Sequence, residues 1–236
     1  MKIAIIPARG GSKRIPRKNI KDFCGKPMIA WSIEVAVNAK CFDRIIVSTD
    51  DAEIAEVSLR YGAEVPFIRD TSISGDYTPV YDVVKDVILR LDDGGSLFDK
   101  ICCLYATAPL LHERYITEGL EMLGSPKCSY TFGIVRFDYP IQRALKKNQF
   151  GNIQMFMPEN FLSRSQDLES AYHDSGQFYW ASKSEWLTQP FTFNEQSKGV
   201  NIPAEYVQDI DTPEDWAVAE YKFNLLKMKT TSSEAY

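Results

Sequence analysis

The chain has 236 residues, of which 44% are hydrophobic and 25% are charged, and its net charge is −5. These values suit a globular protein with one domain and a small elaboration, and the acidic balance argues against a general nucleic-acid or membrane-surface binder. The five cysteines are odd in number and contain no C-x-x-C pair, which favours a reducing, cytoplasmic compartment over a disulfide framework.

Strand and helix patterns alternate through the first half of the chain. Short apolar runs rich in β-branched residues predict strands at residues 2–7, 43–49, 63–68 and 100–106. Apolar residues at helical spacing predict helices between them, at 27–40, 51–62 and 78–91. This order predicts an α/β fold with a mostly parallel sheet and right-handed crossovers.

The second half of the chain is less regular. A helix is expected at 112–123, an apolar β-branched stretch at 128–137, a strand at 176–182 and a last helix beginning near Pro213. Residues 138–175 are polar, rich in turn residues and too long for a plain connection, so we interpret them as an inserted arm or lid. The prediction is a single domain over 1–229 that contains this insertion, followed by a frayed tail at 230–236.

A basic loop follows the first predicted strand. The sequence IPARGGSKRIPRKN, residues 6–19, joins a glycine pair to five cations. Ligands of open α/β sheets bind at the carboxyl ends of strands, and backbone N–H groups beside glycines can form an anion-binding nest. The loop matches neither the Walker A motif nor the dinucleotide fingerprint. It therefore predicts a different kind of phosphate site, the alternative being a solvated basic turn.

A pair of carboxylates lies near the other end of the chain, in QDIDT. Asp209 and Asp211 are two residues apart, so in extended backbone their side chains share a face. Such a pair of hard oxygen ligands suits Mg²⁺. The alternative is structural, with Asp211 capping the helix that begins near Pro213. The sequence contains no G-x-S-x-G motif, so serine hydrolysis is poorly supported.

These segments resemble the signature of the CMP-sialic acid synthetase family, the acylneuraminate cytidylyltransferases. Four further segments keep the family order: VSTDD (47–51), PFIRD (66–70), LYATAPL (104–110) and QDIDTPEDW (208–216). The resemblance covers nearly the whole chain. It implies a Rossmann-like fold of the nucleotide-diphospho-sugar transferase type, with a dimerisation arm. It also implies a cytoplasmic homodimer that joins CTP to a nonulosonic acid with Mg²⁺, giving a CMP-sugar and pyrophosphate.

The resemblance also implies roles for individual residues. The CTP-binding set comprises Ala8, Arg9, Gly10, Gly11, Ser12, Lys13, Lys18, Asn19, Arg69 and Thr78. Arg9, Lys18 and Asp211 are expected to act in catalysis, and Asp209 and Asp211 to hold the metal. No side chain is assigned as the general base.

The sugar-facing segment departs from that of the sialic acid enzymes. They typically contain L-Q-P-T-S-P where this chain contains L-Y-A-T-A-P, so Tyr105 replaces a glutamine. Ser175 stands where those enzymes tend to have asparagine. LYATAP together with SQDLESAYHDSGQFYW is similar to the branch that activates pseudaminic acid for flagellin or surface glycans. The expected sugar-binding residues are Tyr105, Thr107, Arg164, Gln166, Tyr172, His173, Ser175, Gln177 and Tyr179.

Several alternatives stay open at this point. Within the same chemistry, the sugar acid could be N-acetylneuraminic, legionaminic or 3-deoxy-manno-octulosonic acid, or the enzyme could act on a sugar 1-phosphate. From a different class, the chain could be a catalytically silent sensor of CTP or of a sugar nucleotide.

Overall fold

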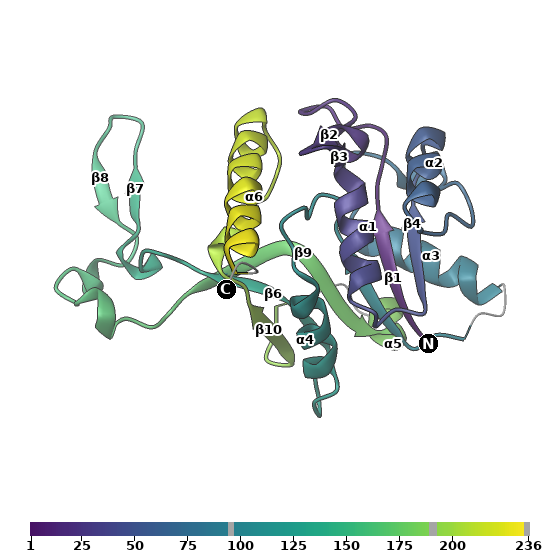
Figure 1. Ribbon diagram of the computed structural model, residues 1–236. Helices are drawn as coiled ribbons and strands as arrows, with labels where there is room; N and C mark the ends of the chain where they lie inside the picture. The colour runs from purple at the N-terminus through teal and green to yellow at the C-terminus, as the bar shows by residue number, and fades with distance from the viewer. Residues whose placement is uncertain (94–96, 189–192, 234–236) are drawn as a thin grey trace.

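A computed structural model describes residues 1–93, 97–188 and 193–233. Within these ranges, a six-stranded sheet has the order β10-β6-β9-β5-β1-β4 (Figure 1). The strands are β1 (Lys2–Pro7), β4 (Arg44–Ser48), β5 (Lys100–Leu104), β6 (Tyr130–Arg136), β9 (Tyr172–Ser182) and β10 (Ser197–Asn201). β9 runs antiparallel to both its neighbours and the other pairs are parallel, which confirms the predicted, mostly parallel sheet.

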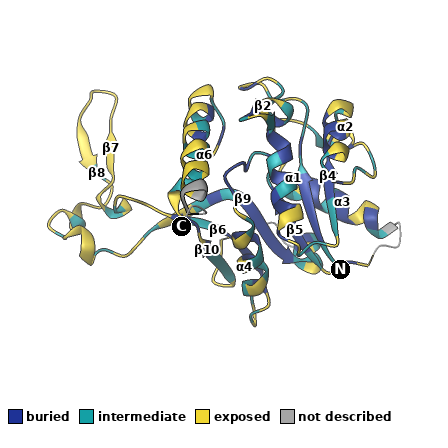
Figure 2. Ribbon diagram, viewed as in Figure 1, coloured by how far each residue is buried: buried dark blue, intermediate teal, exposed yellow. Residues whose placement is uncertain are grey.

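Helices cover both faces of the sheet. α1 (Met28–Asn38), α2 (Ala52–Arg60) and α4 (Glu113–Leu123) pack on one face, and α3 (Val80–Asp93) and α5 (Lys183–Thr188) pack on the other. The side chains of β1 point alternately to the two faces of the sheet: Ile3 and Ile5 pack with α3, and Ile6 packs with α1. This double coverage explains why the first strand is apolar at successive positions, and Figure 2 shows the sheet as the most buried part of the chain.

The predicted strand at 63–68 is wrong as a continuous strand. Only two isolated parallel bridges join this segment to the edge of the sheet in the described structure, Ile46 with Glu64 and Thr49 with Ile68. Pro66 lies between the two bridges and has no N–H to donate, so the ladder cannot run through it.

Residues 137–171, between β6 and β9, leave the sheet as a projecting arm (Figure 1). Its hairpin consists of β7 (Leu145–Lys147) and β8 (Ile153–Met155), and short 3-10 turns make up much of the remainder. β9 already begins at Tyr172 because its first residues pair with the end of β6, so residues 172–175 of the predicted insertion belong to the sheet. Most of the arm is exposed (Figure 2).

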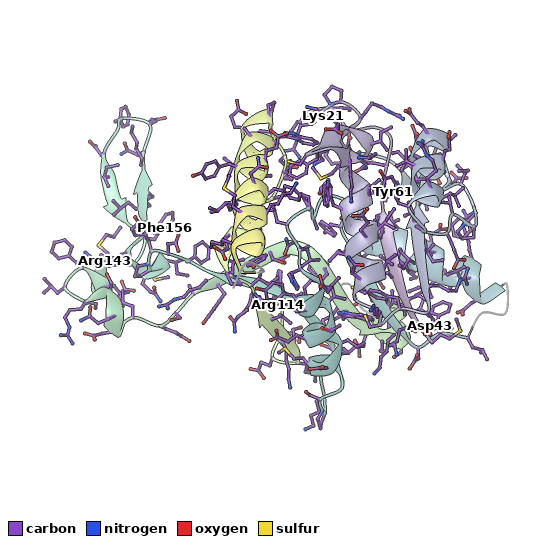
Figure 3. The ribbon with its side chains drawn as sticks, viewed as in Figure 1. Lys21, Asp43, Tyr61, Arg114, Arg143 and Phe156 are labelled. Atoms are coloured by element: carbon purple, nitrogen blue, oxygen red, sulfur yellow. The ribbon has the colours of Figure 1, made fainter. Side chains whose placement is uncertain are left out.

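The last helix, α6 (Pro213–Ser233), packs against the loop that follows β1. The small hairpin of β2 (Asp22–Phe23) and β3 (Lys26–Pro27) places the Phe23 ring 5.3 Å from that of Trp216 and 5.6 Å from that of Phe223. Lys21, labelled in Figure 3, has its Nζ 4.6 Å from the centre of the Trp216 ring. These contacts join the two ends of the sequence.

α6 also corrects the predicted C-terminal tail. Residues 230–233 are helical, whereas 234–236 lie outside the described residues. No helix in the described part of the chain is both long enough and apolar enough to cross a membrane.

Candidate active site

A pocket of about 560 Å³ opens at the carboxyl ends of β1 and β5. Four segments form its walls: the loop after β1, residues 69–83, the residues after β5, and Asp211 just before α6. Ten of the residues predicted to bind substrates or metal line it: Arg9, Ser12, Lys13, Lys18, Asn19, Arg69, Thr78, Tyr105, Thr107 and Asp211. The fold therefore brings the basic loop and one of the two distant carboxylates to the same pocket.

Two cations of the basic loop converge on one carboxylate. Arg9 Nη1 and Lys13 Nζ each lie 2.5 Å from an oxygen of Asp76. Lys13 and then Arg9 hold the pKa of the Asp76 carboxyl below its usual range, so the group remains an anion. Asp76 was not predicted as a site residue, because SGDYTP contains no motif and its cationic partners are far away in sequence. The contact shows that this part of the loop is arranged to hold an anion.

Two other cations meet the Asp211 carboxylate. Lys18 Nζ donates to the Ile210 carbonyl at 2.6 Å and lies 3.4 Å from Asp211 Oδ1, and Arg14 Nη2 lies 2.9 Å from the same oxygen. Arg14 lines the pocket but was not among the predicted contacts, although it belongs to the basic run. Asn19 Nδ2 donates to the Arg9 carbonyl at 2.9 Å and so ties the two parts of the loop together.

Asp211 does not cap α6, so the structural alternative for this residue is wrong. Thr212 Oγ1 accepts from the Asp215 N–H at 3.2 Å, and Asp215 Oδ2 accepts from the Thr212 N–H at 2.8 Å. This reciprocal pair has the geometry of a capping box, with aspartate in the place of the usual glutamate. Because neighbouring side chains satisfy the helix terminus, the Asp211 carboxylate is left to face the pocket.

The glycine pair does not form the expected anion-binding nest. The Gly10 N–H donates to Asp50 Oδ1 at 2.9 Å, and the Ser12 N–H donates to the Gly10 carbonyl at 3.0 Å. A Cβ on Gly10 would lie 2.7 Å from Asp51 Oδ2, so the loop requires glycine there for close approach to the start of α2. In the described structure the side chains, rather than the backbone N–H groups, supply the cationic contacts.

Arg69 lies under the pocket with only 3% of its surface exposed. Its Nε donates to Ser74 Oγ at 3.0 Å, its Nη1 donates to the Ser48 carbonyl at 3.3 Å, and its Nη2 lies 3.7 Å from Asp50 Oδ1. Burial lowers the pKa of Arg69, which Asp50 partly offsets. Arg69 therefore joins the segment 69–83 to the end of β4 and fixes one wall of the pocket.

A cytidylyltransferase family model matches residues 3–229, nearly the entire chain. The chain belongs to the cytidylyltransferase family. It is 46% identical over 224 residues to a pseudaminic acid cytidylyltransferase of Campylobacter jejuni subsp. jejuni, covering 94% of this chain and 97% of the relative. It is 32% identical to a CMP-N,N'-diacetyllegionaminic acid synthase of Legionella pneumophila, covering 92% and 94% of the two chains.

A solved structure supports the same fold. A CMP:2-keto-3-deoxy-manno-octonic acid synthetase complexed with CTP superposes with a TM-score of 0.70, covering 96% of this chain and 99% of the other at 17% identity. At that identity the likeness establishes the fold alone. Nucleotidyltransferase architecture thus follows from both the family match and the sheet.

Three of the predicted CTP contacts do not line the pocket of this cytidylyltransferase. They are Ala8, Gly10 and Gly11. Ala8 is 1% exposed and packs in the core, while its N–H donates to the Ser48 carbonyl at 2.9 Å. Ala8 lies behind the loop because the chain still pairs with the end of β4 there, and the Gly10 N–H is taken by Asp50.

The predicted sugar-binding residues are divided by the fold. Tyr105 and Thr107 line the pocket, and Tyr179 lies behind Tyr105 with the ring centres 5.5 Å apart. Ser175 and Gln177 are buried at 3% and 2% exposure, and the Gln177 amide donates to the Tyr206 carbonyl at 2.8 Å. Neither lines the pocket.

The other predicted sugar contacts lie on or beside the arm. Arg164 pairs with Asp167 at 2.6 Å, and Gln166 lines a separate small pocket within the arm. Tyr172 and His173 are exposed at the start of β9, where the His173 ring packs against Phe137. Within one chain these four residues do not line the pocket, because β9 enters the sheet from the arm, beyond the end of β6.

The two carboxylates of QDIDT are the candidate metal ligands, and of the two only Asp211 lines the pocket. Asp209 is exposed, but neighbouring protein atoms displace part of its hydration and raise the pKa of its carboxyl, and Asp211 raises it further. The described residues hold no cluster of three or more histidine, cysteine, aspartate or glutamate side chains suited to a metal. Mg²⁺ commonly takes one or two protein carboxylates and completes its shell with water and substrate phosphates. A pair of carboxylates beside a phosphate pocket fits that mode of binding.

Proposed function

We propose that this cytidylyltransferase transfers the cytidylyl group of CTP to a nonulosonic acid, pseudaminic acid, and releases pyrophosphate. The observation that carries the proposal is the pocket that Arg9, Lys13 and Lys18 line together with Tyr105 and Asp211. The choice of sugar is supported by 46% identity to a pseudaminic acid cytidylyltransferase along nearly the whole of both chains. The product would serve the glycosylation of flagellin or surface glycans, and the reaction would take place in the cytoplasm.

The reaction is a substitution at phosphorus. The anomeric hydroxyl of the sugar acid attacks the α-phosphorus, so that a new O–P bond forms while the bond to the bridging oxygen of the β-phosphate breaks. The hydroxyl loses its proton and the electron pair of the broken bond leaves with pyrophosphate. Arg9, Lys13 and Lys18 stabilise the negative charge on the phosphates, and catalysis comes mainly from positioning and preorganised charge.

Asp209 and Asp211 would hold Mg²⁺ in the substrate complex. The ion would add positive charge at the α-phosphate and lower the barrier to attack. Arg14 and Lys18 contact Asp211 and orient its carboxylate toward the pocket. The chain itself thus provides both an oriented carboxylate and cations for the phosphates in the same pocket.

The arm supports a homodimer as the working form. It exposes a concentration of large apolar side chains: Leu145, Phe150, Ile153, Phe156, Met157, Phe161 and Leu162. Figure 3 labels Phe156 on this arm, away from the sheet, and large exposed apolar patches commonly mark protein interfaces. We expect sedimentation equilibrium at micromolar concentration to give twice the chain mass, and Phe156→Asp to shift the population toward monomer. A wild-type monomer throughout would contradict the proposed dimer.

Pyrophosphate release tests the function directly. The chain is incubated with CTP and, separately, pseudaminic, legionaminic, N-acetylneuraminic or 3-deoxy-manno-octulosonic acid, with Mg²⁺ or with excess chelator. The expected result is Mg²⁺-dependent release, with the highest kcat/KM for pseudaminic acid. A higher kcat/KM for another acid would reassign the substrate. Binding of CTP without release on any acid would instead support the silent sensor.

A further inference from the structure

β9 contains a bulge beside the pocket. Phe132 of β6 pairs with Tyr179 of β9, and Ile134 pairs with Asp174. An advance of two residues along β6 therefore corresponds to an advance of five residues along β9. Gly176, inside the bulge, has a φ of +64°, and its N–H donates to Asp174 Oδ1 at 2.9 Å. Bulges redirect side chains and are common next to active sites. This one turns the Asp174 carboxylate back along its own strand.

The redirected carboxylate meets a buried tyrosine. The Tyr179 hydroxyl donates to Asp174 Oδ2 at 2.5 Å, and Tyr179 is only 5% exposed. Because an ionised carboxylate can only accept, the single hydroxyl proton of Tyr179 is committed to this bond. A hydrogen bond from phenol to carboxylate is charge-assisted and stronger than one between neutral groups. Asp174 therefore fixes where the Tyr179 oxygen lies.

Tyr179 in turn holds Tyr105 in the wall of the pocket. The two rings pack against each other with their centres 5.5 Å apart, so the position that Asp174 gives to Tyr179 also limits where the Tyr105 ring can lie. The backbone of Tyr105 is held as well, by its N–H to the Gln177 carbonyl at 2.8 Å and by Ser32 Oγ to its carbonyl at 2.8 Å. Tyr105 is thus held at its backbone by two hydrogen bonds and at its ring by Tyr179.

Tyr105 also lies toward the reacting groups. It lines the same pocket as Arg9, Lys18 and Asp211. A rigid phenol at this place presents a defined surface to the substrate. If the Tyr105 ring could rotate freely, part of the free energy of substrate binding would be lost in ordering that ring.

We propose that Asp174 is a positioning residue for the sugar acid: through the Tyr179 hydroxyl it fixes Tyr105, which contacts the sugar side of the substrate. Asp174 touches neither substrate and acts through Tyr179, whose hydroxyl it accepts from and whose ring packs on Tyr105. The inference rests on the proposed function, because it assumes that the pocket wall at Tyr105 receives the sugar acid.

The test separates the two substrates kinetically in the full-length chain. Tyr179→Phe removes the hydroxyl that donates to Asp174 and keeps the hydrogen bond from the Gly176 N–H. Asp174→Asn replaces the charged acceptor of the Tyr179 hydroxyl by a neutral one. Each is expected to raise KM for pseudaminic acid about tenfold, the scale of one hydrogen bond to a charged group, and to leave KM for CTP within about twofold. Tyr130→Phe is the matched control, a buried tyrosine on β6 that packs on Trp186, and should leave both KM values unchanged.

A double variant tests whether Asp174 and Tyr179 act as one unit. If Asp174 acts through the Tyr179 hydroxyl, Asp174→Asn combined with Tyr179→Phe should raise KM for the sugar acid no more than the larger single effect. Additive effects, unchanged KM values, or an equal rise in both KM values with a lower melting temperature would each overturn the proposal. If wild type makes no CMP-sugar from any acid in the panel, the proposed function fails and the positioning role fails with it.

Discussion

Replacing Asp211 by asparagine is expected to lower kcat about 10²-fold or more, the cost of removing one preorganised electrostatic group. The substitution keeps the shape of the side chain but removes the charge that faces Lys18 and Arg14 and would hold Mg²⁺. The fold should survive, since Thr212 and Asp215 cap α6 without Asp211. Steady-state pyrophosphate release with CTP and pseudaminic acid measures the loss, and thermal melting checks the fold.

Asp215→Asn is the matched control for this experiment. It neutralises a carboxylate four residues away that accepts hydrogen bonds from Thr212 and the Asp211 N–H. Weakening that cap should lower the melting temperature slightly and leave turnover nearly unchanged. Wild-type turnover in Asp211→Asn would rule out the role proposed for its carboxylate, and a similar loss in both variants would make that role structural.

Replacing Asp76 by asparagine is expected to tighten CTP binding about tenfold. In the described structure its carboxylate pairs with Arg9 and Lys13, two of the cations that the proposed function assigns to the triphosphate. CTP must displace this internal anion, and because the pairs are exposed to solvent, displacing it costs little. Removing the negative charge of Asp76 frees Arg9 and Lys13 and reduces the repulsion of the nucleotide. We expect these two effects together to lower the Kd for CTP about tenfold. Calorimetric titration with CTP alone measures it.

Asp70→Asn provides the comparison for Asp76. Asp70 lies on the same segment, but its side chain accepts from the Ser72 N–H at the start of a 3-10 turn rather than from the basic loop. Its Kd for CTP should match that of wild type. Raising the ionic strength should shrink the advantage of Asp76→Asn, because salt screens exposed charges. Weaker CTP binding in Asp76→Asn would mean that this carboxylate helps the ligand rather than competing with it.

Local chemistry made much of this fold predictable. The apolar residues 2–7 had to be covered on both sides, and the sheet places Ile3 and Ile5 on one face and Ile6 on the other. The segment 63–68 looked equally strand-like, yet Pro66 limits it to two isolated bridges. The prediction for residues 2–7 holds because every residue there can pair with a neighbouring strand. The prediction for residues 63–68 overlooked that Pro66 has no N–H to donate to a neighbouring strand.

The site shows where sequence reasoning stopped. QDIDT allowed two interpretations of Asp211, and only the hydrogen bonds between Thr212 and Asp215 exclude the capping role. The glycine pair suggested a backbone nest, but Asp50, forty positions away, takes the Gly10 N–H. Ser175 and Gln177 belonged to a segment that resembled a sugar site, and the bulge in β9 leaves both of them buried.

The sequence by itself determined the α/β alternation, the basic loop after the first strand and the pair of carboxylates, because side-chain periodicity, glycine and charge act on neighbours along the chain. Only the tertiary structure decided which charges meet. Asp76 pairs with Arg9 across 67 positions, and Lys18 reaches Asp211 across 193. Such contacts depend on the order of strands in the sheet and on the packing of Phe23 against α6, which no local pattern encodes.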